Sequence, residues 1–484
     1  MDPAGEKYAT TDVLETAGSD KSAVPLDSDQ VYDVAEQRRI IHKVDRRLLV
    51  ILGLMQAVSF LDRGNLANAA VSGMTKDLDL SVGKRYSLAI LVFFIPYVLL
   101  QFPAAILVRK VGPRIFLSSI VVAWGIVMMC LGFVHEWTDL LPLRLLLGAF
   151  EAGCYPSQYY LISSWYSKFD LYTRTSVFYL IGVLGSALGG VLALAFSEMG
   201  GLSNIVSWRW IFIMEGLITI AIGLAGFIFV VDFPEKAHKS WRFLTEDEAA
   251  FIVRRINRDR EDATPEPFSF GRILQPALDP KIWAFALTSF CTTVQAYSVG
   301  YFLPIILETE LGFAAAKAQG LSTPPYLIAM LLMYVESYIS DKVRLRSPIL
   351  YFNSIICIIG LCLLVWTAVP GVQYFGAILV TAGCSSNLPT VMVFQANNIR
   401  GAWKRAFSSA SMIGFGGVGG IAGSLVFRTQ DAPKYLPGIE TCLVANAVTI
   451  IVTTILVFYF CRQNKRADEG RIIIEGLSNF RYVI

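Results

Sequence analysis

Long apolar segments, separated by short polar stretches, make up most of the chain. Each segment has about 20 residues, a length that as a helix crosses the roughly 30 Å hydrocarbon core of a bilayer. Six segments come before a charged stretch at 232–280, and six come after it. The pattern predicts an all-α membrane protein with twelve transmembrane helices, at 48–70, 85–108, 115–134, 140–163, 175–198, 208–231, 282–306, 320–339, 348–369, 372–395, 406–428 and 438–461.

The polar stretches separate two six-helix halves. The N-terminal stretch is polar, has no apolar run and predicts a disordered tail without a cleaved signal. In the central linker, Thr245 precedes apolar residues at helical spacing and can cap a short amphipathic helix. The predicted parts are a tail at 1–45, the first half at 46–231, the linker at 232–280, the second half at 281–461 and a C-terminal tail at 462–484.

The positions of Lys and Arg predict the orientation of the chain. If the N-terminus is cytosolic, 32 of the 41 basic residues fall in tails and loops on the cytosolic side. Basic loops resist translocation across the membrane. We therefore expect both termini and the central linker to be cytosolic.

Two landmarks recur in the second half at nearly the same offset. Lys110-Val111, after the second span, matches Lys342-Val343 at an offset of 232 residues. An arginine followed by two glycines recurs at an offset of 231 with identical spacing: Arg174, Gly185 and Gly189 match Arg405, Gly416 and Gly420. Two pseudo-symmetric halves are typical of transporters that rock around a site at the midplane of the membrane.

Composition narrows the possible functions. The chain is 55% apolar and 16% charged, with a mean hydropathy of +0.55, which excludes a cytosolic enzyme and a secreted disulfide scaffold. The net charge of +3 gives no reason to expect nucleic acid as a partner. The eight cysteines have no metal-ligand spacing, so we expect buried thiols, no metal site and no cofactor.

Glycines are concentrated in the fifth and eleventh predicted spans. Small residues at this spacing let helices approach closely. The competing interpretation, a phosphate-binding loop, would need a preceding strand and a Lys-Ser/Thr pair, neither of which is present in the sequence around these glycines. We expect the glycines to form packing surfaces.

Two predicted spans each carry two charged side chains, which are costly inside a membrane unless they are paired, hydrated or functional. Asp62 and Arg63 lie in the first span, and Arg144 and Glu151 in the fourth. The second pair is two helical turns apart and shares one face, about 10 Å apart along the axis. The first pair is consecutive and points about 100° apart, so one side chain can face the fourth span while the other faces a cavity.

This arrangement indicates a proton-coupled anion site. We expect Asp62 to pair with Arg144, and Asp62 and Glu151 to exchange protons. Arg63 suits the anionic group of a substrate because its charge is fixed and its fork matches a carboxylate. The structural alternative is an ion-pair cluster that only holds the two spans together. Other candidate substrate contacts are Tyr97, Tyr155, Tyr297, Tyr301, Gln295 and Asn387.

Several motifs follow one another between Arg46 and Cys461. They are Leu61-Asp-Arg-Gly-Asn-Leu66, Gly148-Ala-Phe-Glu-Ala-Gly-Cys-Tyr-Pro156 with Ser164-Trp-Tyr166, Trp208-Arg-Trp-Ile-Phe-Ile-Met-Glu-Gly216, Asp232-Phe-Pro234 and Asp431-Ala-Pro-Lys-Tyr435. In this order they resemble the major facilitator superfamily, and within it the fungal allantoate permease family of the anion:cation symporter branch.

The resemblance implies a multi-pass transporter, not an enzyme, at the fungal plasma membrane. It implies proton-coupled symport of a small organic anion, such as a vitamin or an allantoate-like nutrient, by alternating access. In this pattern Arg63 binds the anion, while Asp62 and Glu151 titrate. Arg144 is then the partner that senses protonation of Asp62. The expected partners are the anion, protons and the lipid bilayer, and we expect a monomer.

Two positions depart from the superfamily pattern. Arg109 stands where an acidic residue usually precedes the basic loop motif after the second span, and Ile413 stands where bacterial relatives often use Asn. Two other functions stay open. One is export of an acidic secondary metabolite, because the sequence does not specify direction. The other is a nutrient sensor that does not transport, which would usually need a large cytosolic signalling domain.

Overall fold

The computed structural model describes residues 32–166, 168–240, 243–259, 275–309, 311–343, 345–400, 402–427, 431, 435–475 and 480–484. Residues 1–31 of the predicted N-terminal tail, 260–274 of the predicted linker and 476–479 of the predicted C-terminal tail lie outside the described residues. The chain divides into two units, Met1–Lys43 and Val44–Ile484. The described part of the first unit contains the beginning of helix α1, so helix replaces the last part of the predicted disordered tail.

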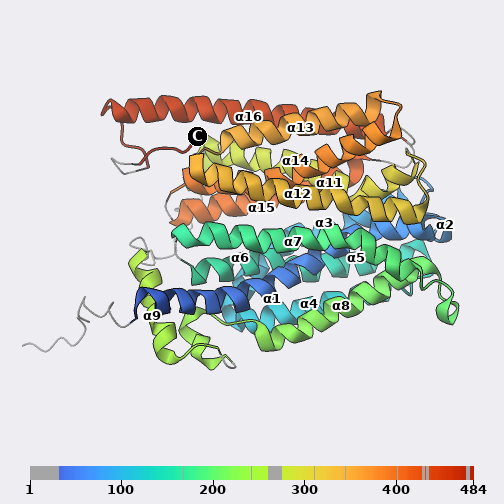
Figure 1. Ribbon diagram of the computed structural model, residues 1–484, viewed down its shortest axis with the longest axis horizontal. Helices are drawn as coiled ribbons and strands as arrows, with labels where there is room; N and C mark the ends of the chain where they lie inside the picture. The colour runs from blue at the N-terminus through green and yellow to red at the C-terminus, as the bar shows by residue number, and fades with distance from the viewer. Residues whose placement is uncertain are drawn as a thin grey trace, which may run out of the picture. The chain divides into compact units, whose positions relative to one another are not determined.

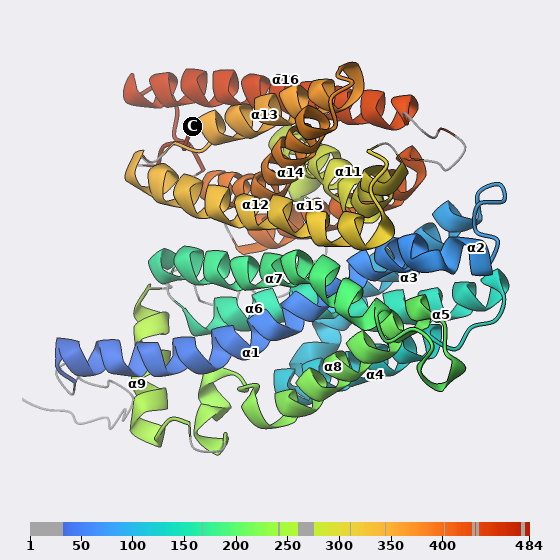
Figure 2. The same ribbon diagram turned by 45° about the vertical axis from the view of Figure 1, so that its right-hand side comes forward.

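Helices of the two predicted halves form two groups in the second unit (Figures 1 and 2). The first group comprises α1 (Val34–Ala69), the π-helix η2 (Ala70–Met74), α2 (Thr75–Asp77), α3 (Arg85–Val111), α4 (Pro113–Leu131), α5 (Trp137–Glu151), α6 (Cys154–Trp165), α7 (Lys168–Ser197), η3 (Leu202–Asn204) and α8 (Ser207–Phe229). The linker contains η4 (Pro234–Lys239), α9 (Glu246–Asp259) and η5 (Gln275–Leu278). The second group comprises α11 (Pro280–Thr309), α12 (Ala315–Val343), α13 (Ser347–Trp366), α14 (Pro370–Asn398), α15 (Ala402–Val426) and α16 (Leu436–Asp468).

Each predicted span overlaps one of these helices, except that the fourth span is divided between α5 and α6. Among the described residues, eight helices are long and apolar enough to cross a membrane, by length and composition. They lie in α4, α7, α8, α11, α13, α14, α15 and α16. The all-helical architecture predicted from the sequence is confirmed.

The outer surface of these helices is apolar and their interior holds charges. Leu331, Ile455 and Phe458 are 63–70% exposed, whereas Asp62 and Arg144 are buried. A water-soluble protein shows the opposite distribution. Lipid around the helices accounts for it, because apolar side chains cost nothing there and the helices satisfy their own backbone groups.

Local sequence explains where individual helices begin. Pro113 starts α4 directly after Gly112, whose φ of 94° suits glycine. At the start of α9, the Thr245 hydroxyl accepts a hydrogen bond from the Glu248 amide (3.3 Å). The Glu248 carboxylate accepts one from the Thr245 amide (3.0 Å), which completes a capping box. The helix that the sequence predicts after Thr245 is therefore present.

The two groups of helices meet through α7 against α12 and through α3 against α15. Glycines make both contacts close. A Cβ atom on Gly190 of α7 would collide with the Gln319 carbonyl oxygen of α12, and one on Gly420 of α15 would collide with the Phe94 ring of α3. The predicted packing role of the glycines is confirmed at these two positions.

Candidate functional site

A cavity of about 190 Å³ lies between the two groups of helices. Residues of α1, α3, α6 and α7 form one wall, and residues of α11, α12, α14 and α15 form the other. Most of the lining is aromatic or small. Arg63 is the one charged side chain in the described lining, so a ligand in this cavity meets a single positive charge among rings and hydroxyls.

Arg63 forms a buried ion pair with Glu151. Its Nη2 and Nε atoms lie 2.7 and 3.0 Å from the same carboxylate oxygen, Oε1. The Ser59 hydroxyl donates to that oxygen as well, at 2.6 Å. The Arg63 side chain is 14% exposed and that of Glu151 is 2% exposed. The arginine faces the cavity, and the carboxylate lies behind it.

Two tyrosine hydroxyls, one from each half, fix the other side of the guanidinium. Nη2 of Arg63 donates to the Tyr97 hydroxyl at 3.1 Å, and Nη1 donates to the Tyr297 hydroxyl at 2.8 Å. The rings of Phe60, Tyr97 and Tyr297 lie 5.4–5.5 Å from the Arg63 Cζ atom, within cation–π range. The structure therefore brings together the predicted residues Arg63, Glu151, Tyr97 and Tyr297.

The predicted pair between Asp62 and Arg144 is not formed. The Asp62 carboxylate accepts hydrogen bonds from the Trp124 indole (2.9 Å) and the Thr219 hydroxyl (3.5 Å) on Oδ2. It accepts one from the Asn65 amide (3.3 Å) on Oδ1. Arg144 is 2% exposed, and its Nε and Nη2 atoms have no partner among the described residues. The reason is the direction of the side chains. Asp62 points towards Trp124 of α4 and Thr219 of α8. Glu151, the acid on the same helix as Arg144, pairs with Arg63 instead.

The remaining predicted residues divide into two sets. Tyr155 and Tyr301 line the cavity, and the Tyr155 hydroxyl lies 3.3 Å from the Met392 sulfur across the two halves. Gln295 and Asn387 are buried but do not line it. The Asn387 amide donates to the Ser354 hydroxyl instead, at 3.4 Å. Ile413 does line the cavity and adds apolar surface there.

Other lining residues carry polar groups that the sequence did not single out: Gln56, Asn68, Tyr179, Ser289, Thr293 and Tyr326. Helical spacing could have identified one of them. Gln56 lies seven residues before Arg63, two turns away on the same face of α1. Ser59, which bonds Glu151, lies one turn before Arg63. Nothing in the sequence separates Tyr179 and Tyr326 from the other tyrosines.

The halves are hydrogen-bonded to each other at the end of the unit that carries α2, here called the α2 end. Gln319 of α12 is 1% exposed, and its amide donates to the Asn68 carbonyl oxygen (3.0 Å) and the Ser72 hydroxyl (2.6 Å). These acceptors lie where α1 passes into the π-helix η2. The Tyr86 hydroxyl also donates to the Tyr301 carbonyl oxygen, at 3.2 Å. These hydrogen bonds join the two walls of the cavity at the α2 end.

Comparison with known proteins agrees with this architecture. The family model of the Major Facilitator Superfamily matches residues 52–424. The chain belongs to the major facilitator superfamily. Members of this superfamily are transporters, so the protein is a multi-pass membrane transporter and not an enzyme.

Similar members of the superfamily come from fungi. The MFS-type transporter cnsO of Penicillium expansum is 32% identical over 466 residues, covering 93% of this chain and 90% of that protein. The Major facilitator-type transporter hxnP of Emericella nidulans is 29% identical, over 96% of this chain and 94% of that protein. The high-affinity nicotinic acid transporter of Saccharomyces cerevisiae is 28% identical, over 97% of this chain and 85% of that protein.

A solved structure shows the same superfamily fold. It is a bacterial homologue of the human lysosomal transporter Spinster, in an inward-facing and occupied conformation. The TM-score is 0.60 at 14% identity, and the match covers 85% of this chain and 94% of that chain. The likeness supports the two-group helical architecture described above.

Proposed function

We propose that this transporter carries a small organic carboxylate together with protons by alternating access, as the allantoate permease resemblance implies. The observation that carries the proposal is the ion pair between Arg63, which faces the cavity, and Glu151, which lies behind it. A fixed positive charge that faces a cavity suits an anionic substrate, and a titratable partner on that charge couples the anion to a proton.

The substrate and Glu151 compete for the same donors. The ionised Glu151 carboxylate occupies Nε and Nη2 of Arg63. Protonation of Glu151 weakens this charge-assisted pairing, and a substrate carboxylate can then accept the two N–H groups as a bidentate ligand. Tyr97 and Tyr297 hold the guanidinium in place during the exchange.

The exchange conserves charge inside the membrane. Without substrate, Arg63 and Glu151 neutralise each other; with substrate, Arg63 and the anion do so while Glu151 carries the proton. Both states avoid an uncompensated buried charge, which is the costly arrangement in a medium of low dielectric constant. We assign Asp62, a buried acid next to Arg63 in α1, as a second proton site.

The nicotinic acid transporter among the relatives suggests a first substrate to test. Nicotinic acid is a planar aromatic carboxylic acid, and Tyr155, Tyr179 and Tyr297 offer rings around the cavity. Offset stacking on such rings favours flat aromatic ligands. Small aromatic carboxylates are therefore the substrate class that we place first.

We propose twelve membrane crossings with the α9-bearing end of the molecule in the cytosol of a fungal cell and the α2 end outside the plasma membrane. The distribution of basic residues supports this orientation. The cross-half hydrogen bonds of Gln319 and Tyr86 then close the outer side, so that the cavity faces the cytosol.

The test uses the full-length protein in liposomes with an internal pH dye. Nicotinate, benzoate and other small carboxylates are added outside, each beside its amide. Proton uptake with a carboxylate but not with its amide supports symport. Absence of proton movement with every compound, from folded protein, contradicts proton-coupled import. Counterflow is then measured in liposomes preloaded with a carboxylate. Exchange of this carboxylate across the membrane supports export of an acidic metabolite, and its absence shows that transport is lost.

Replacing Arg63 with Lys is the first substitution to make. Lysine keeps the charge but loses the planar fork, so we expect carboxylate affinity to fall by about tenfold or more. Arg85→Lys is the matched control, because Arg85 packs on Trp137 and does not line the cavity. Equal affinities of Arg63→Lys and the unmodified protein would remove Arg63 from the binding site.

A further inference from the structure

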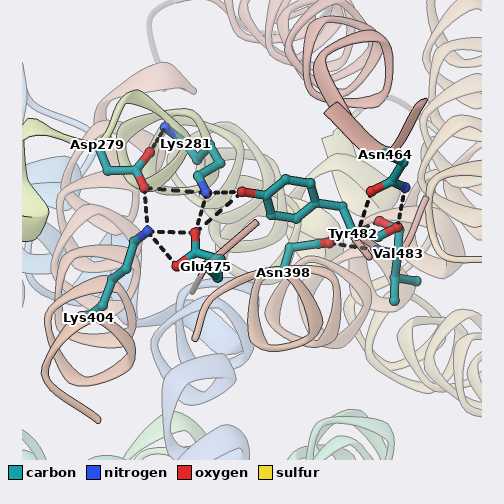
Figure 3. Close-up of polar contacts among 8 residues, drawn as sticks. All are labelled: Asp279, Lys281, Asn398, Lys404, Asn464, Glu475, Tyr482 and Val483. Atoms are coloured by element: carbon teal, nitrogen blue, oxygen red, sulfur yellow. Dashed lines mark hydrogen bonds and ion pairs between the residues drawn. The ribbon is translucent and has the colours of Figure 1, made fainter. Parts of the chain in front are cut away.

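The last residues of the chain return to the second helical group after α16 ends at Asp468. Two asparagine side chains hold two consecutive residues there (Figure 3). Asn464 of α16 accepts from the Tyr482 amide (2.8 Å) and donates to the Tyr482 carbonyl oxygen (2.9 Å). Asn398, the last residue of α14, does the same for Val483, at 2.8 and 3.0 Å. Each amide side chain thus pairs with the backbone as a neighbouring strand would.

A charge cluster fixes the earlier part of this segment, as Figure 3 shows. Glu475 accepts from Lys281 Nζ at the start of α11 (2.7 Å) and from Lys404 Nζ at the start of α15 (2.7 and 2.9 Å). Lys404 also pairs with Asp279 at the end of the linker, at 2.7 Å. Lys281 is 5% exposed and donates to the Tyr482 hydroxyl at 2.6 Å. One cluster therefore joins the linker, two helices and the chain end.

The same segment contributes to the hydrophobic core. Ile474 and Tyr482 belong to one buried cluster with Phe285 of α11, Phe394 of α14 and Met412 of α15. The Tyr482 ring is stacked on Phe460 of α16, with ring centroids 4.5 Å apart. Met412 also lines the central cavity. The contacts thus run without interruption from the chain end to the cavity wall.

We propose that the described residues 470–475 and 480–484 form a strap that holds α11, α14, α15 and α16 together at the α9 end and so fixes the second-half wall of the central cavity. Three of these helices, α11, α14 and α15, contribute lining residues about two turns from the strap contacts. Four separate anchors act on one short segment: the Asn464 pair, the Asn398 pair, the lysine cluster and the buried ring. A chain end that only covered the surface would need none of them.

Hydrogen–deuterium exchange of the full-length protein in nanodiscs tests the strap and needs no substrate. Asn464→Leu removes both hydrogen bonds to Tyr482 at nearly constant volume. We expect amide exchange in the α9-end turns of α11, α14 and α15 to become about tenfold faster. Ile473→Ala is the matched control, because Ile473 lies in the same segment with its side chain 69% exposed, and its exchange rates should be unchanged.

Tyr482→Phe is the second variant. It removes the hydroxyl that accepts from Lys281 and keeps the stacked ring, so the second half stays folded and the acceleration should be smaller than with Asn464→Leu. The proposal is overturned if exchange becomes faster in the strap alone and is unchanged at the helix ends in both variants. The segment would then not stabilise the helices. That result would leave the carboxylate transport proposal untouched.

Discussion

Glu151 accepts three hydrogen bonds on one oxygen, two from Arg63 and one from Ser59. The bonds from Arg63 are charge-assisted, and a buried site of low dielectric constant strengthens each bond. In the proposed mechanism, protonation of Glu151 frees two N–H groups of Arg63 for the substrate. At the residue scale, the proposed mechanism is this competition between Glu151 and the substrate for the N–H groups of Arg63.

Glu151→Gln should separate binding from proton coupling. Glutamine keeps a carbonyl acceptor for Arg63 but carries no charge and no titratable group. We expect carboxylate affinity to lose the part of its pH dependence that Glu151 supplies, whereas in the unmodified protein affinity should rise as pH falls, by at most about tenfold per pH unit for each linked proton. Binding measured at several pH values, with proton uptake in liposomes, checks this.

Glu198→Gln is the control for that substitution, because Glu198 is an exposed acid near the end of α7. It should keep the pH profile of the unmodified protein. An unchanged profile in Glu151→Gln would assign the coupling to another acid, with Asp62 the first to examine.

The ionisable residues of the site can be predicted from the sequence, but not all of their partners can. Charged residues in apolar spans stand out, which is why Arg63 and Glu151 were recognised. Helical geometry gives the angle between Asp62 and Arg63, but it does not say which neighbouring helix lies at each angle. The pairing of Asp62 with Arg144 was wrong for that reason. Buried amides such as Asn387 look alike in sequence whether they line a cavity or bond a neighbouring helix.

At the scale of helices, the junction of α1 and η2 positions the acceptors of the cross-half hydrogen bonds at the α2 end. A π-helical turn shifts the backbone hydrogen bonds by one residue, and such turns often occur at functional positions. Gly73 has a φ of 106° within this turn. The Asn68 carbonyl oxygen and the Ser72 hydroxyl accept from Gln319 of the opposite half. The irregular turn thus supplies the acceptors for a cross-half contact.

Gln319→Leu should weaken this contact between the halves. Loss of two buried hydrogen bonds of about 1 kcal/mol each shifts the balance towards opening at the α2 end by about tenfold or more. A cysteine placed at Ser186, which lines the cavity, should react faster with an impermeant maleimide added at the α2 side. The exposed Cys461 is replaced beforehand.

Gln373→Leu is a closely matched control. Gln373 is also buried and donates to two carbonyl oxygens, those of Leu364 and Thr367, but both belong to its own half. It should not change the labelling rate at position 186. Equal rates in the two leucine variants would mean that the cross-half bonds of Gln319 do not govern access.

At the scale of the whole molecule, the repeated landmarks and twelve apolar segments were sufficient to predict two helical groups. The chain end was not predicted. Residues 480–484 show neither helical spacing nor an apolar run of useful length, so the sequence indicated only a short tail. Their order comes from Asn398, Asn464 and Lys281, which are far from them in sequence. Contacts of this kind have no local sequence signal.

The charge cluster of the strap gives the second half a specific response to acid. Burial alone would raise the pKa of Glu475, but hydrogen bonds from Lys281 and Lys404 and their charges hold it below the usual value. For Asp279, burial likewise acts upwards, and the bond from Lys404 with the charge of Lys281 lowers the pKa overall. A lowered pKa means that this stabilisation is present above the ordinary values of 3.8 and 4.5 and is lost as pH falls through the folded values.

Thermal unfolding in detergent from pH 8 to pH 3 checks this expectation. The unmodified protein should keep the cluster's contribution down to about pH 5 and lose it below about pH 4. Glu475→Gln should lower the melting temperature by about 2 °C at neutral pH. It should also reduce the fall of the melting temperature at acid pH. Glu469→Gln, which breaks a pair with the 70% exposed Arg471, is the control and should change neither. If the melting temperature falls equally at acid pH in both variants, Glu475 is not the cause of that fall.

The pairing of Arg63 with Glu151 also decides how far the membrane potential can act on the carrier. One uncompensated charge that crosses the full field gains or loses about 2.3 kcal/mol per 100 mV, which is roughly a fiftyfold change in an equilibrium. In the proposed mechanism the pair cancels this charge in the unloaded cavity, so we expect the return of the empty carrier to be nearly independent of voltage. If one proton accompanies one monovalent anion, the movement of the loaded carrier is also nearly independent of voltage. The energy for uptake then comes from the difference in pH across the membrane, and depolarising the cell leaves the rate almost unchanged.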